Sequence, residues 1–260
     1  IQVNGKIIQG RKAMRDLKYL GYFENLLREA NNELIVQAKK DGKVCVPFVC
    51  ENTPEPLMNL DGTFSIRLSA PNTGSMDIAT YYMTSFLCET SRALLERAIE
   101  GGYNYLDALL GAESCATMER MEEHFFLINP VKNPRFFVTQ IDPPMKGDKT
   151  NLDYYKAQLK LKVVDELKNR FGVDVSDAAM RKAIEDHNEI SRIITEIGDF
   201  RKSENPNITG YEFHVINLVS QVCPHYLIKP YLEETLEELK TREPEEKFPF
   251  RARVVLVGSE

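Results

Sequence analysis

Apolar residues recur at two different spacings along the chain, and the two spacings alternate. Steps of three and four residues predict a long opening helix over about residues 11–40, with Gly42 placed to end it. Short runs rich in β-branched and apolar residues predict buried strands instead. The strands are expected at residues 44–50, 64–68, 105–110 and 135–141, and helices at 91–99 and 116–124. Because strands that alternate with helices need crossover connections, this half of the chain is predicted to form a parallel sheet covered on both faces.

The strand signal ends near residue 150, and a helical periodicity takes over. Four helices are expected: over residues 152–171, from the N-cap candidate Ser176, from near Thr209, and over 226–240. Residues 253–258 again have the short apolar pattern of a strand. We therefore predict an α/β fold in three parts. These are a Rossmann-like or flavodoxin-like parallel-sheet domain over residues 1–150, a helical region over 151–248, and the first strand of a second α/β domain within 249–260.

Composition and charge narrow the functional classes. Hydrophobic residues make up 43% of the chain and charged residues 28%, which is the balance of an ordinary globular protein. The formal net charge is −6 and basic residues do not cluster, so a nucleic-acid partner is not expected. No apolar run approaches the length of a membrane span, and the first residues lack the layout of a signal peptide. The sequence therefore predicts a cytoplasmic protein that binds neither membranes nor nucleic acid.

The cysteines are the first candidates for chemistry. Their number is odd and their spacing wide, and without a secretory signal both features argue against a disulfide framework. Reduced thiols remain, as core residues, metal ligands or nucleophiles, and burial in the core is the default for any one of them. The five cysteines are Cys45, Cys50, Cys88, Cys115 and Cys223.

Cys88 and Cys115 stand out because each lies where a strand or loop leads into a predicted helix. The carboxyl ends of parallel strands line the ligand crevice of such sheets. Thiolates are also favoured at helix N-termini, where unpaired N–H groups and the helix dipole stabilise negative charge. The residues alone leave two interpretations open: a shared metal or redox site, or two buried structural cysteines.

Several common sites are excluded by spacing. The chain has no CxxC, so rubredoxin-like, ferredoxin-like and zinc-ribbon sites are not expected. The HExxH, GxSxG, GxGxxG and P-loop patterns are also absent, so the chain is not predicted to bind ATP or NAD itself. The four histidines are not at ligand spacing with one another, and none is assigned to catalysis. His187 is predicted to face solvent, and His124 to lie near a helix end, where a cation suits the dipole.

Two polar turns have an ordinary structural interpretation beside a functional one. Residues 50–55 follow a strand, and the plain interpretation is a turn in which Thr53 caps a helix and Pro54 takes its first position. Residues 72–75 precede a helix and could bind an anion, but an ordinary N-cap loop is favoured.

Several short motifs, in the same order, resemble those of the 2-hydroxyacyl-CoA dehydratase and benzoyl-CoA reductase family, and in particular the D-component of 2-hydroxyglutaryl-CoA dehydratase. The resemblance spans nearly the whole chain. Residues 49–55 resemble the C-S-Y-x-P-E-E turn of that family, residues 88–115 its C…G-x-x-x-L-D…S/T-C-D block, residues 171–192 its helix with A-I and N-E-x-R, and residues 208–212 its I-S/T-G-x-E.

The resemblance implies an iron–sulfur enzyme. Subunits of this family have two α/β domains and typically bind a [4Fe–4S] cluster through three cysteines, of which Cys88 and Cys115 would be the first two here. A homologous second subunit and an ATP-dependent iron–sulfur activator protein, which donates one electron, are the implied partners. The implied reaction is dehydration of an (R)-2-hydroxyacyl-CoA to an enoyl-CoA through a ketyl radical.

The chain departs from the family pattern at three places. Ala116 follows Cys115 where the family often has Asp. Glu51 stands where Ser is common, in the turn that approaches the substrate, and it is our candidate catalytic base. The third cysteine ligand would come from the second α/β domain, most of which we expect to be missing from this chain. The departures keep two alternatives open: a benzoyl-CoA reductase-like low-potential reductase subunit, and a non-catalytic or electron-relay partner subunit.

Overall fold

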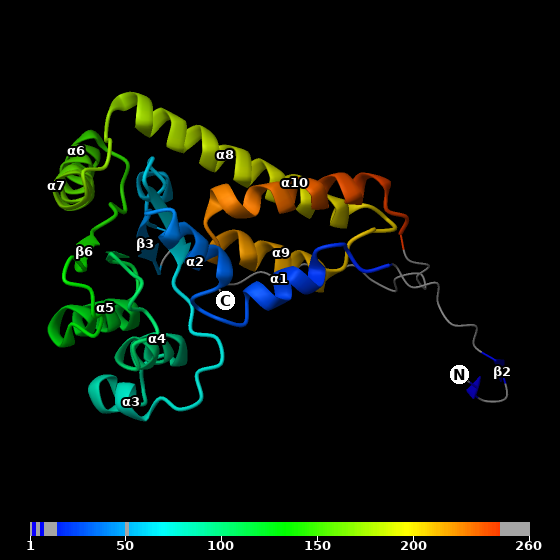
Figure 1. Cartoon of the computed structure of the whole chain (residues 1–260), viewed down its shortest axis with the longest axis horizontal. Coiled ribbons are helices and arrows are strands. Elements are labelled where there is room, and N and C mark those ends of the chain that lie inside the picture. Colours follow the sequence, from blue (N-terminus) through cyan, green and yellow to red (C-terminus); the bar gives the residue numbers. More distant parts are fainter. Residues whose placement is uncertain (1, 4–5, 8–14, 50–51, 245–260) are drawn as a thin grey trace.

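The computed structural model describes residues 2–3, 6–7, 15–49 and 52–244. One end of the molecule contains a four-stranded sheet in which every pairing is parallel, with β3 and β6 labelled on the left of Figure 1. The predicted parallel α/β fold is therefore confirmed. The strands follow the order β4-β3-β5-β6, with bounds β3 (Val44–Phe48), β4 (Thr63–Arg67), β5 (Ala108–Ala112) and β6 (Phe137–Ile141). A separate antiparallel pair joins β1 (Gln2–Val3) to β2 (Lys6–Ile7).

The strand order places a topological switch point between β3 and β5. The strand that comes first in this sheet, β3, has the second, β4, on one side and the third, β5, on the other. In open α/β sheets, ligands bind at such a point, outside the carboxyl ends of the strands. Pro47 is tolerated within β3, where it lies opposite Ile66 of β4, although a proline cannot donate to the ladder.

Alternate residues of the strands face two different cores, which is why β3 and β5 are buried along their whole length. Cys45, Phe64 and Leu109 contribute to one core, with apolar residues of four helices. These helices are α2 (Glu33–Lys40), α3 (Asp77–Met83), α4 (Glu89–Ile99) and α5 (Ala116–Ile128).

The opposite face of the sheet is covered by the chain that follows β6. Val46 and Leu110 pack there with Val163 and Leu167. The predicted helix over residues 152–171 is present as one continuous run of three segments. They are α6 (Lys149–Leu159), the π-helical segment η2 (Lys160–Val164) and α7 (Asp165–Phe171).

The other end of the molecule is helical, and α8 extends from the sheet to this end (Figure 1). Leu20 and Phe23 of the N-terminal α1 share one buried core with Ile193, Ile216 and Leu232 of the later helices. The bounds are α1 (Leu20–Leu26), α8 (Asp177–Asp199), the short η3 (Phe200–Lys202), α9 (Gly210–Val222) and α10 (His225–Thr241).

Side-chain caps fix two of the predicted helix starts. Ser176 Oγ accepts the backbone N–H of Ala179 and begins α8, as predicted. Thr209 and Glu212 form a reciprocal capping box at the start of α9. Arg242 then binds the Glu212 carboxylate at 2.7 Å in an almost fully buried ion pair. The Thr-Gly-x-Glu motif at this point is therefore explained by local structure.

Three local predictions are wrong. The opening helix is interrupted, because the Asn32 side chain accepts the N–H groups of Leu34 and Ile35 and starts a new helix, α2. The predicted strand at 105–110 starts too early, because residues 101–105 form a turn and β5 begins only at Ala108. Among the described residues between β3 and β4, the only helix is the short 3₁₀ helix η1 (Glu55–Met58), and its N-cap is Pro54 rather than Thr53. The predicted strand at residues 253–258 lies outside the described residues.

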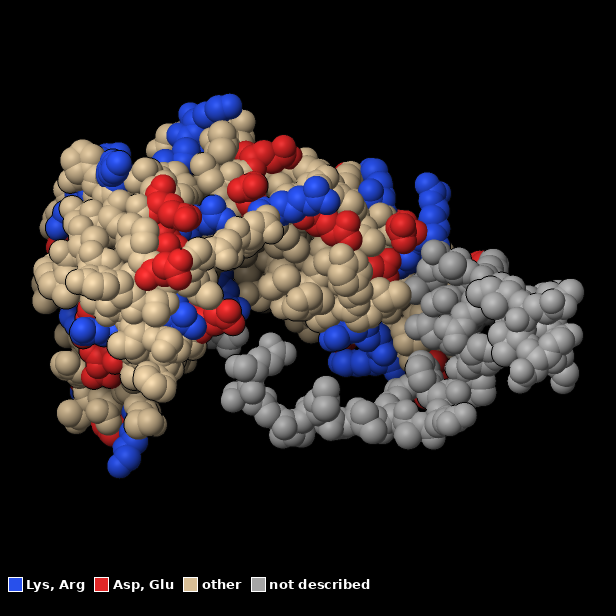
Figure 2. Space-filling view, turned by 90° about the horizontal axis from the view of Figure 1, so that it is seen from below, with Lys and Arg blue, Asp and Glu red and all other residues tan. Residues whose placement is uncertain are grey.

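The surface carries charges of both signs. Figure 2 shows one face on which acidic and basic side chains are interspersed. Many form exposed ion pairs one helical turn apart, such as Lys182 with Asp186 and Arg192 with Glu196, and such pairs contribute little to stability. Within the described part of the chain, every helix is too short or too polar to cross a bilayer.

Candidate functional site

Cys88 and Cys115 occupy equivalent positions on neighbouring helices. Cys88 is the N-cap residue of α4, and Cys115 is the N-cap residue of α5. Cys115 follows β5 by three residues, so it lies beside the switch point of the sheet. Both side chains are exposed. The exposure rules out the interpretation of this pair as two buried structural cysteines.

Thr117, in the first turn of α5, brings the two thiols together. Its hydroxyl oxygen lies 3.2 Å from the Cys88 sulfur and 3.2 Å from the Cys115 sulfur. The two sulfur atoms therefore lie within twice that distance of each other. Cys88 also accepts the backbone N–H of Ser91 at 3.4 Å, with the Ser91 hydroxyl 3.2 Å away. Two cysteines that are 27 positions apart in the sequence thus contact the same hydroxyl at the surface.

Hydrogen bonds favour the thiolate form of both cysteines. Partial burial raises the pKa of Cys88, but hydrogen bonds from Ser91 and Thr117 outweigh burial, and the pKa lies below its ordinary value. The pKa of Cys115 is also lowered, first by the Thr117 hydroxyl and then by the backbone of Met118. Thiolates are the form that binds iron or zinc.

The remaining described cysteines have the opposite character. Cys45, on β3, and Cys223, at the end of α9, are fully buried. Burial raises the pKa of Cys45 well above its ordinary value and that of Cys223 to about 12. Neither thiol is suited to a metal at neutral pH. Cys50 and the candidate base Glu51 lie outside the described residues, and the assignment of Glu51 stays a prediction.

The exposed thiol pair fits a metal cluster as two of its ligands. The sulfurs are accessible, lie close together, are disposed to lose their protons, and face the positive ends of two helix dipoles. That Cys88 and Cys115 act as ligands nevertheless remains a prediction, because the arrangement supplies two thiolates and a cluster needs further ligands.

The helix that begins at Cys115 also carries a buried carboxyl group, that of Glu122. Glu122 of α5 is fully buried and accepts a hydrogen bond from Gln140 of β6 at 2.6 Å. Burial raises its pKa to about 7. Gly111 of β5 makes this position possible, because a Cβ atom there would overlap the Glu122 carboxylate. No sequence pattern singled out Glu122.

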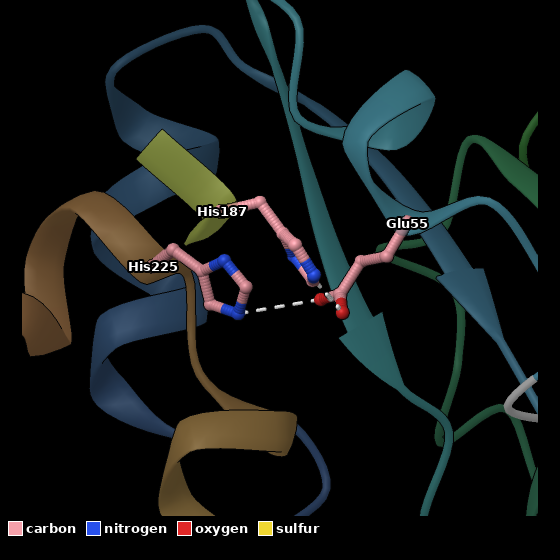
Figure 3. A group of neighbouring side chains, drawn as sticks. All are labelled: Glu55, His187 and His225. Atoms are coloured by element: carbon pink, nitrogen blue, oxygen red, sulfur yellow. Dashed lines mark ion pairs between the residues drawn. The ribbon is translucent and has the colours of Figure 1, made fainter. Parts of the chain in front are cut away.

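A second group of side chains, which the sequence did not predict, meets where the sheet joins the helical end. Glu55 of η1, His187 of α8 and His225 of α10 point toward one another (Figure 3). The prediction that His187 faces solvent is wrong, because its side chain is only 28% exposed and its Nδ1 lies 3.6 Å from a Glu55 oxygen. His225 is more buried still, and burial lowers its pKa. Only tertiary packing brings these three residues together, so spacing along the chain carried no signal.

Fold and thiol pair together define a class: a parallel α/β protein with two thiolate-prone cysteines at helix N-termini beside its switch point. The family described as 2-hydroxyglutaryl-CoA dehydratase, D-component, matches this chain over residues 50–260. The chain belongs to this family, and the resemblance inferred from its motifs is confirmed.

Curated relatives agree with this assignment. Over 242 residues the chain is 21% identical to the (R)-phenyllactyl-CoA dehydratase beta subunit of Clostridium sporogenes, covering 93% of this chain and 63% of that protein. It is 21% identical to one of the benzoyl-CoA reductase subunits of Thauera aromatica, covering 68% of this chain and 45% of that protein. It is 22% identical to the beta subunit of lactoyl-CoA dehydratase of Anaerotignum propionicum, covering 60% and 40%. The chain thus spans less than two thirds of the length of these relatives.

Proposed function

We propose that this chain is part of one subunit of an iron–sulfur enzyme that dehydrates an (R)-2-hydroxyacyl-CoA to an enoyl-CoA. The observation that carries the proposal is the convergence of Cys88 and Cys115 on Thr117, at the edge of the sheet where α/β proteins bind ligands. Membership of a dehydratase family supports the reaction class. Two of the relatives are named as dehydratase subunits for phenyllactyl-CoA and lactoyl-CoA.

In this proposal Cys88 and Cys115 bind two irons of a [4Fe–4S] cluster as thiolates. The Ser91 backbone N–H, the Thr117 hydroxyl and the two helix N-termini stabilise the negative charge on the sulfurs. When bound, the cluster supplies a low-potential electron and an iron that can act as a Lewis acid toward a substrate oxygen. The ligand set is completed by one further cysteine from elsewhere in the full-length protein. An electron delivered to the thioester carbonyl would give a ketyl radical anion that expels the 2-hydroxyl group as hydroxide. A base would then take a proton from C3, and return of the electron to the cluster or to the next substrate would leave the enoyl-CoA.

Glu51 is our candidate for the base that moves a proton. In the sequence it follows the end of β3 by three residues. A carboxylate at such a position can take a proton from a carbon that the reduced thioester has acidified. This assignment depends on the substrate lying over the carboxyl ends of β3 and β5, where the thiol pair also lies.

The proposed partners follow from the names of the relatives and from the chemistry. Each of the three relatives is named as one subunit of its enzyme, which supports a homologous second subunit for this chain too. A one-electron start to the reaction requires a donor, for which we propose an ATP-dependent iron–sulfur activator protein.

A reductase is the second candidate, because the benzoyl-CoA reductase subunit is also 21% identical to this chain, over 68% of it, whereas the phenyllactyl-CoA dehydratase subunit matches 93% of it. The two reactions differ in electron use. A reductase consumes electrons in proportion to product, whereas a dehydratase needs one electron to start and then turns over repeatedly.

The test is reconstitution of the full-length subunit with its partner, an activator protein and ATP under anaerobic conditions. With (R)-phenyllactyl-CoA or (R)-lactoyl-CoA, we expect enoyl-CoA to form in large excess over electrons supplied. Cys88→Ala should abolish turnover, and Cys45→Ala, a buried thiol on the same face of the fold, should keep it. Product that matches the electrons one for one would support the reductase. No reaction with intact clusters, or full activity of Cys88→Ala, would reject the proposal and favour a non-catalytic subunit.

A further inference from the structure

We propose that Glu55, His187 and His225 form a binding site for one divalent first-row metal ion, of which Zn²⁺ is the probe of choice. The three side chains come from η1, α8 and α10, whereas the thiol pair is built on α4 and α5. The proposal therefore does not depend on the iron–sulfur assignment. Two imidazoles and one carboxylate are a ligand set that holds zinc while a further coordination position stays open.

The distances suit a metal better than they suit hydrogen bonds. His225 Nε2 lies 3.3 Å from one Glu55 oxygen, and His187 Nδ1 lies 3.6 Å from the other. One ligand atom from each of the three residues lies within 4.8 Å of the other two. Ligand atoms around a tetrahedral zinc with bonds of about 2.0–2.1 Å are separated by roughly 3.3–3.4 Å. Small side-chain movements would therefore bring all three into coordination.

One of the proposed ligand atoms is buried without a hydrogen-bond partner. His187 Nδ1 is buried and has no hydrogen-bond partner among the described residues. Its separation of 3.6 Å from Glu55 is too long for a hydrogen bond. Buried polar atoms without a partner are rare in folded proteins. A metal ion between the three side chains would satisfy this nitrogen and neutralise the Glu55 carboxylate.

The surrounding residues hold the carboxylate in place. Ser65 of β4 donates its hydroxyl to Glu55 at 2.7 Å, and Asn59 donates to the Ser65 oxygen at 2.7 Å. Asn59 also accepts the backbone N–H of Ser65 and donates to the Glu55 backbone carbonyl. His225 forms a hydrogen bond with the backbone of Ser220. Outer hydrogen bonds of this kind orient metal ligands and are typical of metal sites.

A cavity gives access to the site. It has a volume of about 410 Å³, and both histidines line it together with Lys43, Asp186 and Lys229. A metal ion bound by the three residues would therefore have an open side from which water or a small anion can coordinate. It would also link η1, which follows the first strand of the sheet, to α8 and α10 of the helical end.

The test measures Zn²⁺ binding to the full chain carrying Cys88→Ser and Cys115→Ser, so that the exposed thiols cannot contribute. Isothermal titration and metal analysis after desalting should give one Zn²⁺ per chain, with a raised Tm. His187→Ala and His225→Ala should each weaken binding at least tenfold. The matched control is His214→Ala, which removes an exposed histidine of α9.

Two results would overturn this assignment. One is the absence of stoichiometric binding in the folded chain that carries Cys88→Ser and Cys115→Ser, and the other is unchanged binding in His187→Ala. If His225→Ala does not fold, His187→Ala still decides, because that side chain is partly exposed. Failure here would leave the iron–sulfur proposal untouched, and loss of iron from the thiol variants would leave this site untouched.

Discussion

At the scale of single residues, some positions in the motifs shared with the family serve the stability of the fold rather than a binding site. Asp107, at the end of the G-x-x-x-L-D motif, is a structural residue. Its carboxylate is 2% exposed, pairs with Lys39, and accepts the backbone N–H of Cys45 and the Asn133 amide. It therefore ties α2, β3 and the loop before β6 to the start of β5.

Removal of Asp107 should destabilise the fold strongly. In Asp107→Ala the Lys39 ammonium loses its partner and the buried N–H of Cys45 is left unsatisfied, so we expect a loss of about 3 kcal/mol or more in the free energy of unfolding. Urea denaturation measures this loss. Asp61→Ala is the control, because the Asp61 side chain is 90% exposed and its distance of 3.8 Å from Lys43 makes a weak ion pair. This substitution should lower the free energy of unfolding by less than about 1 kcal/mol. Equal losses would show that the Asp107 network is not stabilising.

The two classes of cysteine should differ in reactivity. In the metal-free chain, iodoacetamide should modify Cys88 and Cys115 at neutral pH well before Cys45 and Cys223. The reasons are exposure and the hydrogen bonds that favour the thiolate at the first two positions. Peptide mass mapping over time gives the order. Prior modification of a buried thiol in the folded chain would contradict the described geometry.

At the scale of elements, the sequence predicted most strands and helices because their apolar residues follow the period of each structure. Ser176 and Thr209 could be recognised as helix starts from the sequence. Their side chains accept backbone N–H groups of the first turn, and this contact stabilises the helices. Asn32 is an equally good cap, but its position gives no clear helix start in the sequence, because the apolar stripe continues on both sides of it. At this point the apolar periodicity predicts one continuous helix, whereas the Asn32 side chain caps a new helix, and the structure contains the new helix.

Glu122 makes the packing of α5 on β5 and β6 sensitive to pH. A glutamate in the unfolded chain loses its proton near about pH 4.3, whereas Glu122 in the fold retains it to about pH 7. Between these values the folded state binds more protons than the unfolded state, so stability falls as pH rises through this window. The penalty is complete above the folded pKa.

Glu122→Gln should remove that penalty. We expect the variant to match the parent near about pH 4.5 and to exceed it by up to about 3 kcal/mol near about pH 7.5. Urea unfolding at the two pH values measures the difference. Glu123→Gln, an exposed neighbour paired with Arg120, should show no such change. A Glu122→Gln effect that is equal at both pH values would show that the carboxyl is already ionised in the fold.

At the scale of the whole molecule, the parallel sheet and the helical end were predictable, and the sites were predictable only in part. Cys88 and Cys115 could be paired from sequence because each precedes a helix. The group of Glu55, His187 and His225 could not, since its members lie on three elements that meet only in the folded chain. The contact of Thr117 with both thiols could not be predicted either, since Cys88 and Thr117 lie on two helices that meet only in the folded chain.

The most direct test of the cluster assignment is anaerobic analysis of iron and acid-labile sulfide in the purified full-length subunit, with its visible spectrum. We predict about four irons and four sulfides per chain, with a broad absorption near about 400 nm, and loss of both in Cys88→Ala and Cys115→Ala but not in Cys45→Ala. A colourless, iron-free protein, or one whose iron survives both substitutions, would contradict the assignment of this thiol pair to a cluster.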